Sequence, residues 1–306
     1  MGTPEFAVAS LDALVQAGCK IVAVITAPDK PAGRGMKMNE SAVKKYAVEK
    51  GLHVLQPVKL KDPQFIEELK ALQADLQVVV AFRMLPEMVW NMPPMGTINV
   101  HGSLLPQYRG AAPINWAVIN GEKETGVTTF KLQHEIDTGN ILLQESFPIG
   151  EDETAGEVHD RMKEIGAKLL VKTVTGLADG TLQEIPQSAY ADPGSTGTVD
   201  TIKHAPKIFT ETCKIDWDQP VAAIHNLIRG LSPYPAAFTY LNDKMLKIYK
   251  AKKEITTVHA SPGTVDTDKK SYLKMAGPDG YIHITELQLE GKKKMPVEEF
   301  LKGYRF

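Results

Sequence analysis

Three polar residues alternate along one short, otherwise apolar segment of the chain: Asn99, His101 and Ser103. Side chains two residues apart in an extended strand point to the same face, so an amide, an imidazole and a hydroxyl are expected to project together. An Asp-Thr-Gly turn that begins at Asp137 supplies a carboxylate further along the chain. Polar side chains are not expected at the end of a strand whose other residues are suited to burial, so we infer a catalytic role for them.

An amide, an imidazole and a carboxylate together suit the direct transfer of an acyl group. The amide N–H can polarise the acyl oxygen, a protonated imidazole can stabilise negative charge on it, and the carboxylate can hold the imidazole charged. The absence of a nucleophilic Ser or Cys from this set argues against a covalent hydrolase. A lone histidine at a strand end is more often structural, so it is the combination of Asn99, His101 and Asp137 that favours catalysis.

The first two-thirds of the chain alternate strand-like and helix-like segments. This alternation predicts an α/β fold with a Rossmann-like, doubly wound and mostly parallel sheet. Ligands of such sheets bind at the carboxyl ends of the strands, which is where Asn99 and His101 fall. The expected strands are residues 20–26, 76–81, 97–100, 127–132 and 141–147, and the expected helices are residues 6–17, 39–50, a helix opened by Asp62-Pro63, and one from the Thr154–Glu157 capping box to about Gly180.

The last third has a different character. Residues 183–205 contain several Pro and Gly and little periodicity, which predicts a linker. A helix at 218–229, capped by Asp218, precedes short strands at roughly ten-residue spacing, a pattern typical of a small OB-like β-barrel. We therefore expect a catalytic domain at 1–182, a linker at 183–205 and an OB-like domain at 206–306.

Composition and charge narrow the function classes further. The chain of 306 residues, 43% hydrophobic and 24% charged, is typical of a globular protein, and we expect no membrane span, no signal sequence and two free thiols of a cytoplasmic protein. Its net charge of −2 is unevenly distributed, because residues 203–306 carry 17 Lys and Arg against 12 Asp and Glu. A basic last third on an acidic body favours a polyanionic partner, with surface lysines kept for solubility as the alternative.

The motifs, taken in order, resemble the formyltransferase family that uses 10-formyltetrahydrofolate, and within it the members that act on methionyl-tRNA. The resemblance extends along nearly the whole chain. It rests on Asn-x-His followed by Ser-Leu-Leu-Pro-x-x-Arg-Gly, on Asp-Thr-Gly, and on Met1-Gly2-Thr3-Pro4, Pro28 to Gly35, Gly110 to Ile114 and Ile215-Asp216-Trp217.

The resemblance implies formyl transfer from 10-formyltetrahydrofolate to the α-amino group of initiator methionyl-tRNA. Asn99, His101 and Asp137 would form the catalytic triad, and no metal is implied. The expected pteridine pocket comprises Phe82, Arg83, Met84, Leu85, Ser103, Leu104, Leu105 and Pro106.

The acceptor is implied by residues 29–38, a Gly- and Pro-rich loop with three cationic side chains. In the tRNA-acting members a loop of this kind enters the acceptor stem, a role that would pass to Arg34 and Lys37, whereas the alternative is a flexible surface loop. Basic residues of the last third would bind the phosphate backbone: Lys207, Lys244, Lys247 and Lys250.

Other functions stay open at this point. A relative that formylates a UDP-linked amino sugar shares Ser-Leu-Leu-Pro and the barrel, although Pro-Ala-Gly-Arg-Gly is not expected in it. A non-catalytic folate- or RNA-binding protein is a further alternative, and a monomer is our expectation. Family members also carry an apolar strand before Met-Gly-Thr-Pro, so we expect that strand to be missing from this sequence, which begins at Met1.

Overall fold

The structure, a computed structural model, describes residues 1–32, 37–190 and 202–305, and the chain divides into two compact units. Each unit is assembled from segments that alternate along the sequence. Unit 1 comprises Met1–Arg109, Gly126–Ser146 and Asp160–Lys203, and unit 2 comprises Gly110–Thr125, Phe147–His159 and His204–Phe306.

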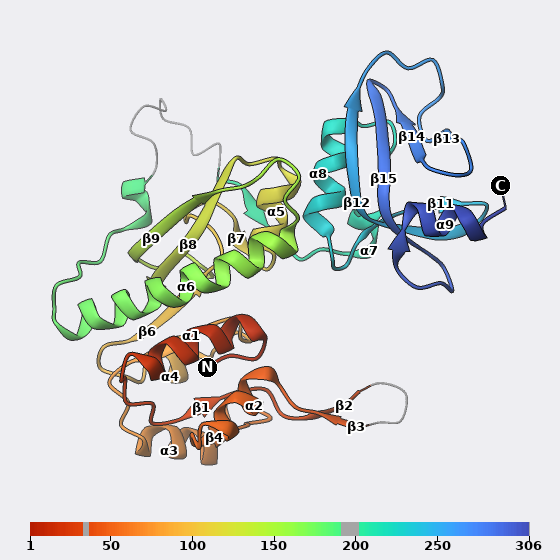
Figure 1. The fold of residues 1–306 in the computed structure, drawn as a ribbon. Helices are drawn as coiled ribbons and strands as arrows, with labels where there is room; N and C mark the ends of the chain where they lie inside the picture. The colour runs from red at the N-terminus through yellow and green to blue at the C-terminus, as the bar shows by residue number, and fades with distance from the viewer. Residues whose placement is uncertain (33–36, 191–201, 306) are drawn as a thin grey trace. The chain divides into compact units, whose positions relative to one another are not determined.

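Unit 1 contains the alternating strands and helices that the sequence predicts (Figure 1). Its strands are β1 (Val24–Ile25), β2 (Lys30–Ala32), β3 (Lys37–Asn39), β4 (Val54–Leu55), β5 (Gln77–Val79), β6 (Thr97–His101) and most of β8 (Glu124–Lys131) and β9 (Ile141–Pro148). Its helices are α1 (Glu5–Gln16), α2 (Ala42–Glu49), α3 (Pro63–Ala71), α4 (Glu87–Trp90), most of α6 (Ala155–Ala178) and the 3-10 helix η1 (Gln187–Tyr190).

The sheet of unit 1 is mixed, not mostly parallel as expected from the sequence. β1 pairs with β4 and β5 with β6 in parallel, whereas β6 pairs with β8 antiparallel. The strand order in the second group is β5-β6-β8-β9, and only a short loop joins β8 to β9, a length that suits a hairpin and excludes a parallel crossover. Gly2 connects the two groups, because its amide donates to Ile25 and it bridges Val80 in parallel.

The starts of α3 and α6 follow the local signals in the sequence. Asp62 caps α3, accepting a hydrogen bond from the Gln64 amide at 2.9 Å, and Pro63 occupies the first turn. Thr154 and Glu157 form the expected capping box at the start of α6, with the Thr154 amide 2.8 Å from the glutamate. These side chains satisfy amide groups that a helix start otherwise leaves unpaired.

Helices cover the sheet of unit 1 through buried apolar residues. Phe65 and Leu69 of α3 pack with Ile25, Leu55 and Val79 in one core cluster. α6 packs on β6 and β8, and the Thr173 hydroxyl lies 2.8 Å from that of Thr129. The strand that carries Asn99 and His101, β6, is therefore fixed by its pairing with β5 and β8 and by the packing of α6 on one face.

Unit 2 is a sheet with helices against it. Among its described residues the sheet runs β11-β12-β15-β14-β13 with β16 on β15, and no pairing joins β13 back to β11, so it is a half-barrel. Ile224 and Ile228 of α8 are buried in its core with Leu246 and Leu287. Its elements are β10 (His204–Ala205), β11 (Ala237–Leu241), β12 (Lys244–Ile255), β13 (Val265–Thr267), β14 (Leu273–Gly277), β15 (Gly280–Leu289), β16 (Met295–Pro296), α5 (Pro113–Ile119), α7 (Thr210–Cys213), α8 (Val221–Leu231) and α9 (Val297–Gly303), and β7 (Arg109–Gly110) begins at its boundary with unit 1.

The start of α8 corrects the sequence prediction. The helix begins at Val221, not at Asp218, and Gly230 lies inside it. Asp279, in the turn between β14 and β15, accepts a hydrogen bond from the Val221 amide at 2.9 Å and so caps the helix from a distant part of the chain. Local sequence favours Asp218 as the cap, because it cannot reveal a partner that lies 58 residues further along the chain.

Candidate functional site

β6 brings two of the predicted catalytic residues to one end of the sheet. Asn99 pairs with Val79 of β5 and with Phe130 of β8, while His101 pairs with Thr128. Asn99 is half-buried, and His101 is 7% exposed. Their spacing of two residues places both side chains on the same face of β6, as predicted.

The structure brings Asp137 to His101. The Nδ1 atom of His101 lies 3.8 Å from a carboxylate oxygen of Asp137, and both side chains are largely buried. The other ring nitrogen, Nε2, lies 2.9 Å from the backbone carbonyl oxygen of Tyr108. A carboxylate beside an imidazole can orient that ring, so the pair can stabilise negative charge on a bound acyl group.

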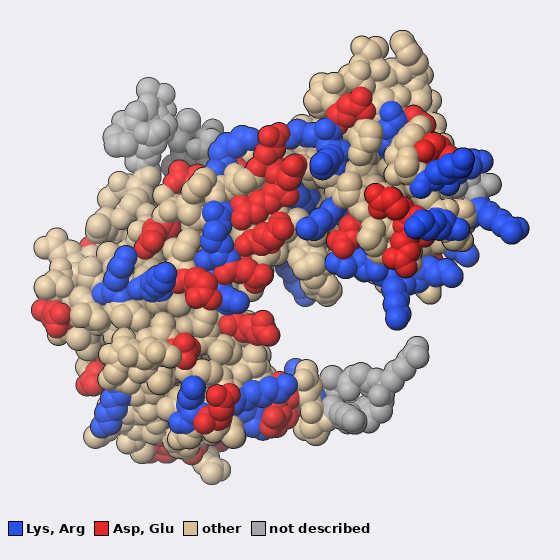
Figure 2. All heavy atoms as spheres, in the orientation of Figure 1, with Lys and Arg blue, Asp and Glu red and all other residues tan. Residues whose placement is uncertain are grey.

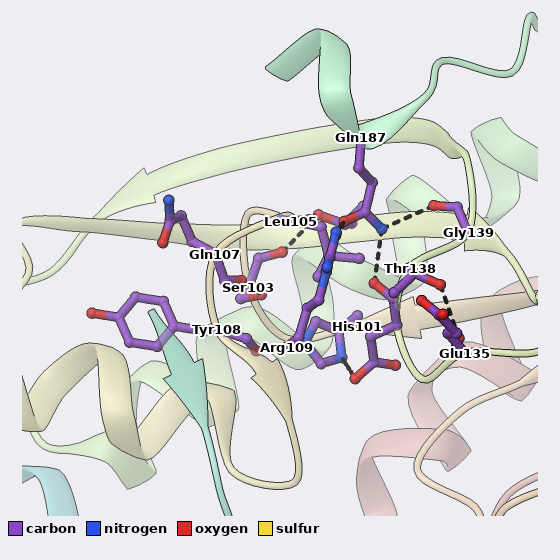
Figure 3. Close-up of polar contacts among 12 residues, drawn as sticks. His101, Ser103, Leu105, Gln107, Tyr108, Arg109, Glu135, Thr138, Gly139 and Gln187 are labelled. Carbon is purple, nitrogen blue, oxygen red and sulfur yellow. Dashed lines mark hydrogen bonds and ion pairs between the residues drawn. The ribbon is translucent and has the colours of Figure 1, made fainter. Parts of the chain in front are cut away.

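The turn that carries Asp137 has an unusual backbone. Asp137 has a φ of 56°, in the left-handed region that few residues other than glycine adopt. The backbone at Gly139 passes close to Lys131, and only glycine fits there because a Cβ would lie 1.6 Å from the carbonyl oxygen of Lys131. The Gln187 amide group donates to the carbonyl oxygens of Asp137 and Gly139, at 2.8 and 2.9 Å (Figure 3).

The Ser-Leu-Leu-Pro loop is anchored to β8 and β9. The hydroxyl of Thr128 donates to the carbonyl of Ser103 and accepts from the amide of Leu105, and Gln144 donates to the Leu105 carbonyl at 2.8 Å. Ser103 donates its own hydroxyl to the Gln107 carbonyl and is 1% exposed. The loop that follows His101 is thus fixed on both sides.

Residues 82–85 are placed in different surroundings. Arg83 is exposed and donates to the carbonyls of Pro57 and Val58, beside a cavity of about 210 Å³ lined mainly by the loop between β4 and α3 and by the first turns of α3. Phe82 is half-buried and Met84 is 73% exposed. Leu85 is buried and packs in the core cluster of unit 1.

The predicted loop at 29–38 is built on a two-stranded hairpin. β2 and β3 pair antiparallel, with Ala32 opposite Lys37, and the hairpin projects from the end of β1 (Figure 1). Asp29, at its base, forms an ion pair with Lys44 of α2 and accepts a hydrogen bond from Gln56 at 2.8 Å. The hydrogen bond from Lys44 lowers the pKa of Asp29, and Asp29 in turn raises the pKa of Lys44.

Of the predicted tRNA-binding residues, Arg34 lies outside the described residues and Lys37 begins β3. The four lysines belong to unit 2. Lys207 lies over the Phe209 ring, Lys244 is exposed, Lys247 donates to the Pro235 carbonyl, and Lys250 is 3.7 Å from Glu157. In Figure 2, Lys and Arg side chains are interspersed with Asp and Glu on the face shown.

The described residues contain neither a metal-binding cluster nor a membrane-spanning helix. Within residues 1–32, 37–190 and 202–305, no group of three or more His, Cys, Asp and Glu side chains is arranged to hold a metal ion. No helix in the same ranges is both long enough and apolar enough to cross a membrane.

Sequence reasoning missed several residues around this site. Gln187 lies in the segment that was predicted to be only a linker, and Arg109, which contacts it, was noted only as part of a motif. Thr128 and Gln144 were not singled out. A polar residue directly after Pro186 was the one available signal for Gln187, and it is a weak one.

Comparison with known proteins gives consistent matches along the chain. Residues 1–174 match the family model "Formyl transferase", and residues 207–305 match "Formyl transferase, C-terminal domain", so Gln187 lies between the matched ranges. The chain is 55% identical to the methionyl-tRNA formyltransferase of Parabacteroides distasonis, covering 100% of this chain and 94% of that protein. It is 51% identical to the protein of the same name from Bacteroides fragilis, with 99% and 94% covered.

A solved structure shares the fold at lower sequence similarity. The N-formyltransferase from Helicobacter canadensis, in complex with folinic acid and dTDP-3-aminofucose, matches with a TM-score of 0.68 and 22% identity. The match covers 96% of this chain and 97% of that one.

Proposed function

The chain belongs to the formyl transferase family, and from this premise we infer that it acts as a methionyl-tRNA formyltransferase. It transfers the formyl group of 10-formyltetrahydrofolate to the α-amino group of initiator methionyl-tRNA. The observation that carries this function is the 55% identity over the whole chain to a methionyl-tRNA formyltransferase. The contact between His101 and Asp137 supports the chemistry.

We propose the following roles for the site residues, which the geometry of β6 and the Asp137 turn supports. The neutral α-amine attacks the formyl carbon, a C–N bond forms to that amine, and the bond from the formyl carbon to N10 of the folate breaks. Asn99 donates a hydrogen bond to the formyl oxygen while His101 stabilises the negative charge that develops there. Asp137 orients His101, accepts the proton that the amine loses and passes it, through a water, toward N10.

The residues at this end of the sheet fit a folate, whose binding sites are mostly apolar with a few polar contacts. When bound, 10-formyltetrahydrofolate supplies the activated formyl group. The half-buried Phe82 and Leu104 and the exposed Met84 offer apolar surface, and Ser103, Leu105 and Pro106 shape the loop after His101. The proposal keeps Arg83 and Leu85 in the pocket, with Arg83 donating to the Val58 carbonyl and Leu85 packed in the core cluster behind it.

We propose tRNA-binding residues in each of the two units. Arg34 and Lys37 contact the acceptor stem, and Lys207, Lys244, Lys247 and Lys250 bind phosphates.

We further propose that the protein is a cytoplasmic monomer with domain limits 1–182, 183–205 and 206–306. The same proposal gives unit 1 a doubly wound strand order and the C-terminal sheet an OB-like curl. The parallel pairs β1–β4 and β5–β6 and the short antiparallel strands of unit 2 support the last two points.

The alternative functions are not favoured. A nucleotide-linked amino sugar is bound by the Helicobacter canadensis protein, but that protein is only 22% identical, against 55% for the tRNA-acting relative. A non-catalytic folate- or RNA-binding protein does not need a buried His101–Asp137 pair.

The experiment compares three acceptors for formyl transfer from 10-formyltetrahydrofolate: charged initiator methionyl-tRNA, uncharged tRNA and a UDP-linked amino sugar. Transfer to the charged tRNA alone is expected. Transfer to the sugar alone would preserve the catalytic roles and overturn the acceptor, and no transfer to any of them would overturn the proposed function.

A further inference from the structure

Gln187 is a buried amide whose hydrogen-bonding groups are all used. The residue is 5% exposed, and its amide N–H groups donate to the carbonyl oxygens of Asp137 and Gly139. Its amide oxygen accepts from Nε and Nη2 of Arg109, with the Nε contact at 3.0 Å (Figure 3). Because each donor and acceptor has a partner, the orientation of the amide is fixed.

The turn that Gln187 contacts is also held by the Thr138 hydroxyl, which donates to the Glu135 carbonyl at 3.1 Å, and by Asn140, which donates to Glu184 at 3.1 Å. Residues 133–136 are exposed, and Ile136 is 60% exposed, so no buried apolar side chain from this part of the turn fixes it. The turn nevertheless has to keep Asp137 at a φ of 56°, a conformation that costs energy unless the surroundings enforce it. Two hydrogen bonds from one amide to the carbonyls on either side of Thr138 provide such enforcement.

Gln187 also closes a ring of contacts around His101. The imidazole Nε2 contacts the Tyr108 carbonyl, and the next residue, Arg109, donates to Gln187. Gln187 donates to the backbone of Asp137, whose carboxylate lies 3.8 Å from Nδ1 of His101. A displacement of Gln187 therefore moves Asp137 relative to His101.

We propose that Gln187, held by Arg109, is a positioning residue that sets the place of Asp137 beside His101 for formyl transfer. The inference rests on the proposed function. Gln187 is not needed merely to attach residues 185–190 to the domain. Ile185 and Ile141 already do so, because they exchange two backbone hydrogen bonds at 2.8 and 2.9 Å. Gln187 itself neither donates nor accepts toward the reacting atoms in this arrangement, so its effect passes through Asp137.

The test is a double-mutant cycle between Gln187 and Asp137. Gln187→Ala and Gln187→Glu are made in the wild-type chain, and Gln187→Ala is also made with Asp137→Asn. Glu at this position can still pair with Arg109 but has no N–H group for the two carbonyl oxygens. Gln187→Glu therefore distinguishes the loss of these two hydrogen bonds from a failure of the protein to fold. Gln183→Ala, at an exposed position of the same segment, is the matched control.

Both Gln187 variants are expected to lower kcat by about tenfold to a hundredfold, because a displacement near 1 Å has effects of this size. KM for both substrates should stay within about twofold of wild type, as expected when binding contacts are intact. In the Asp137→Asn chain, Gln187→Ala should change kcat less than about twofold, since residues that act as a unit are not additive.

An equal loss of kcat in both backgrounds would overturn the inference, as would unchanged kcat in Gln187→Glu or a loss confined to KM. Failure of the wild-type chain to transfer formyl would contradict the proposed function instead. Thermal unfolding of each variant checks that Gln187→Glu is folded.

Discussion

Nε2 of His101 lies 2.9 Å from the backbone carbonyl oxygen of Tyr108. A carbonyl oxygen can only accept, so Nε2 carries a proton and donates it. The other ring nitrogen, Nδ1, faces the Asp137 carboxylate at 3.8 Å. Since the Tyr108 partner is a backbone group, side-chain substitution cannot remove this acceptor, and the fold itself keeps the contact.

His101→Ala is expected to give a folded protein with almost no formyl transfer. Loss of one group that stabilises the oxyanion adds about 3–4 kcal/mol to the barrier. The measurement is kcat with saturating methionyl-tRNA, and His134→Ala, at an exposed site 87% accessible, is the control that should keep full activity. A His101→Ala protein that kept more than about a tenth of the wild-type kcat would exclude His101 from this role.

Asp29→Asn is expected to weaken the tRNA step without affecting the folate step. Asp29 fixes the base of the β2–β3 hairpin through Lys44 and Gln56, and an amide cannot replace its ion pair. KM for methionyl-tRNA should rise severalfold, whereas KM for 10-formyltetrahydrofolate should not change. Equal changes in both KM values would show that Asp29 supports the whole domain and not the hairpin.

Lys244→Ala is expected to reduce the salt dependence of tRNA binding. Each phosphate contact contributes about 0.7–0.9 to the slope of log affinity against log salt concentration. Lys250→Ala should have a smaller effect, because Lys250 is already 3.7 Å from Glu157. Filter binding between low and moderate salt measures the slopes, with Lys172→Ala in α6 as control. An unchanged slope for Lys244→Ala would remove Lys244 from the binding surface.

His225 is expected to make the stability of the protein fall at mildly acidic pH. Burial lowers the pKa of His225 below 6.5, and Lys253 and Arg229 act in the same direction, while Asp152 opposes them. The unfolded chain therefore takes up the proton first, so this contribution is fully present above about pH 6.5 and is lost as the pH falls toward the folded-state value.

Urea unfolding at pH 7.5 and 5.5 checks this expectation. The free energy of unfolding of wild type should fall between pH 7.5 and pH 5.5 by at most about 1.4 kcal/mol per pH unit for this one group. His225→Gln should show a smaller fall, and His134→Gln should behave as wild type. If His225→Gln kept the full wild-type slope, the pH dependence would belong to other groups.

Much of unit 1 could be predicted because its signals are local. Asp62-Pro63 and the Thr154–Glu157 box predict where α3 and α6 begin, and the apolar run around Asn99 predicts a buried strand. The spacing of Asn99 and His101 also determines a shared face. Local patterns of this kind act over a few residues, and the structure agrees with them to within a few residues at most ends.

The rest depends on partners that are distant in sequence. The antiparallel direction of β8 depends on its pairing with β6, and Asp279 caps α8 from 58 residues away. Gln187 carries no pattern that identifies it, because its amide becomes informative only when Arg109 and the Asp137 turn surround it. A single sequence contains no periodicity that encodes such contacts.

The capping of α8 by Asp279 has a consequence for the order of events at the ribosome. Chains emerge from the amino end, so the residues of α8 leave the exit tunnel well before residue 279 does. Until then the Val221 amide lacks its acceptor, and the first turn, the costly part of helix formation, has no support at its start. The start of α8 is therefore expected to become stable only late in synthesis, together with the β14–β15 turn. By contrast, the strands that pair with β6 are synthesised well before residue 279.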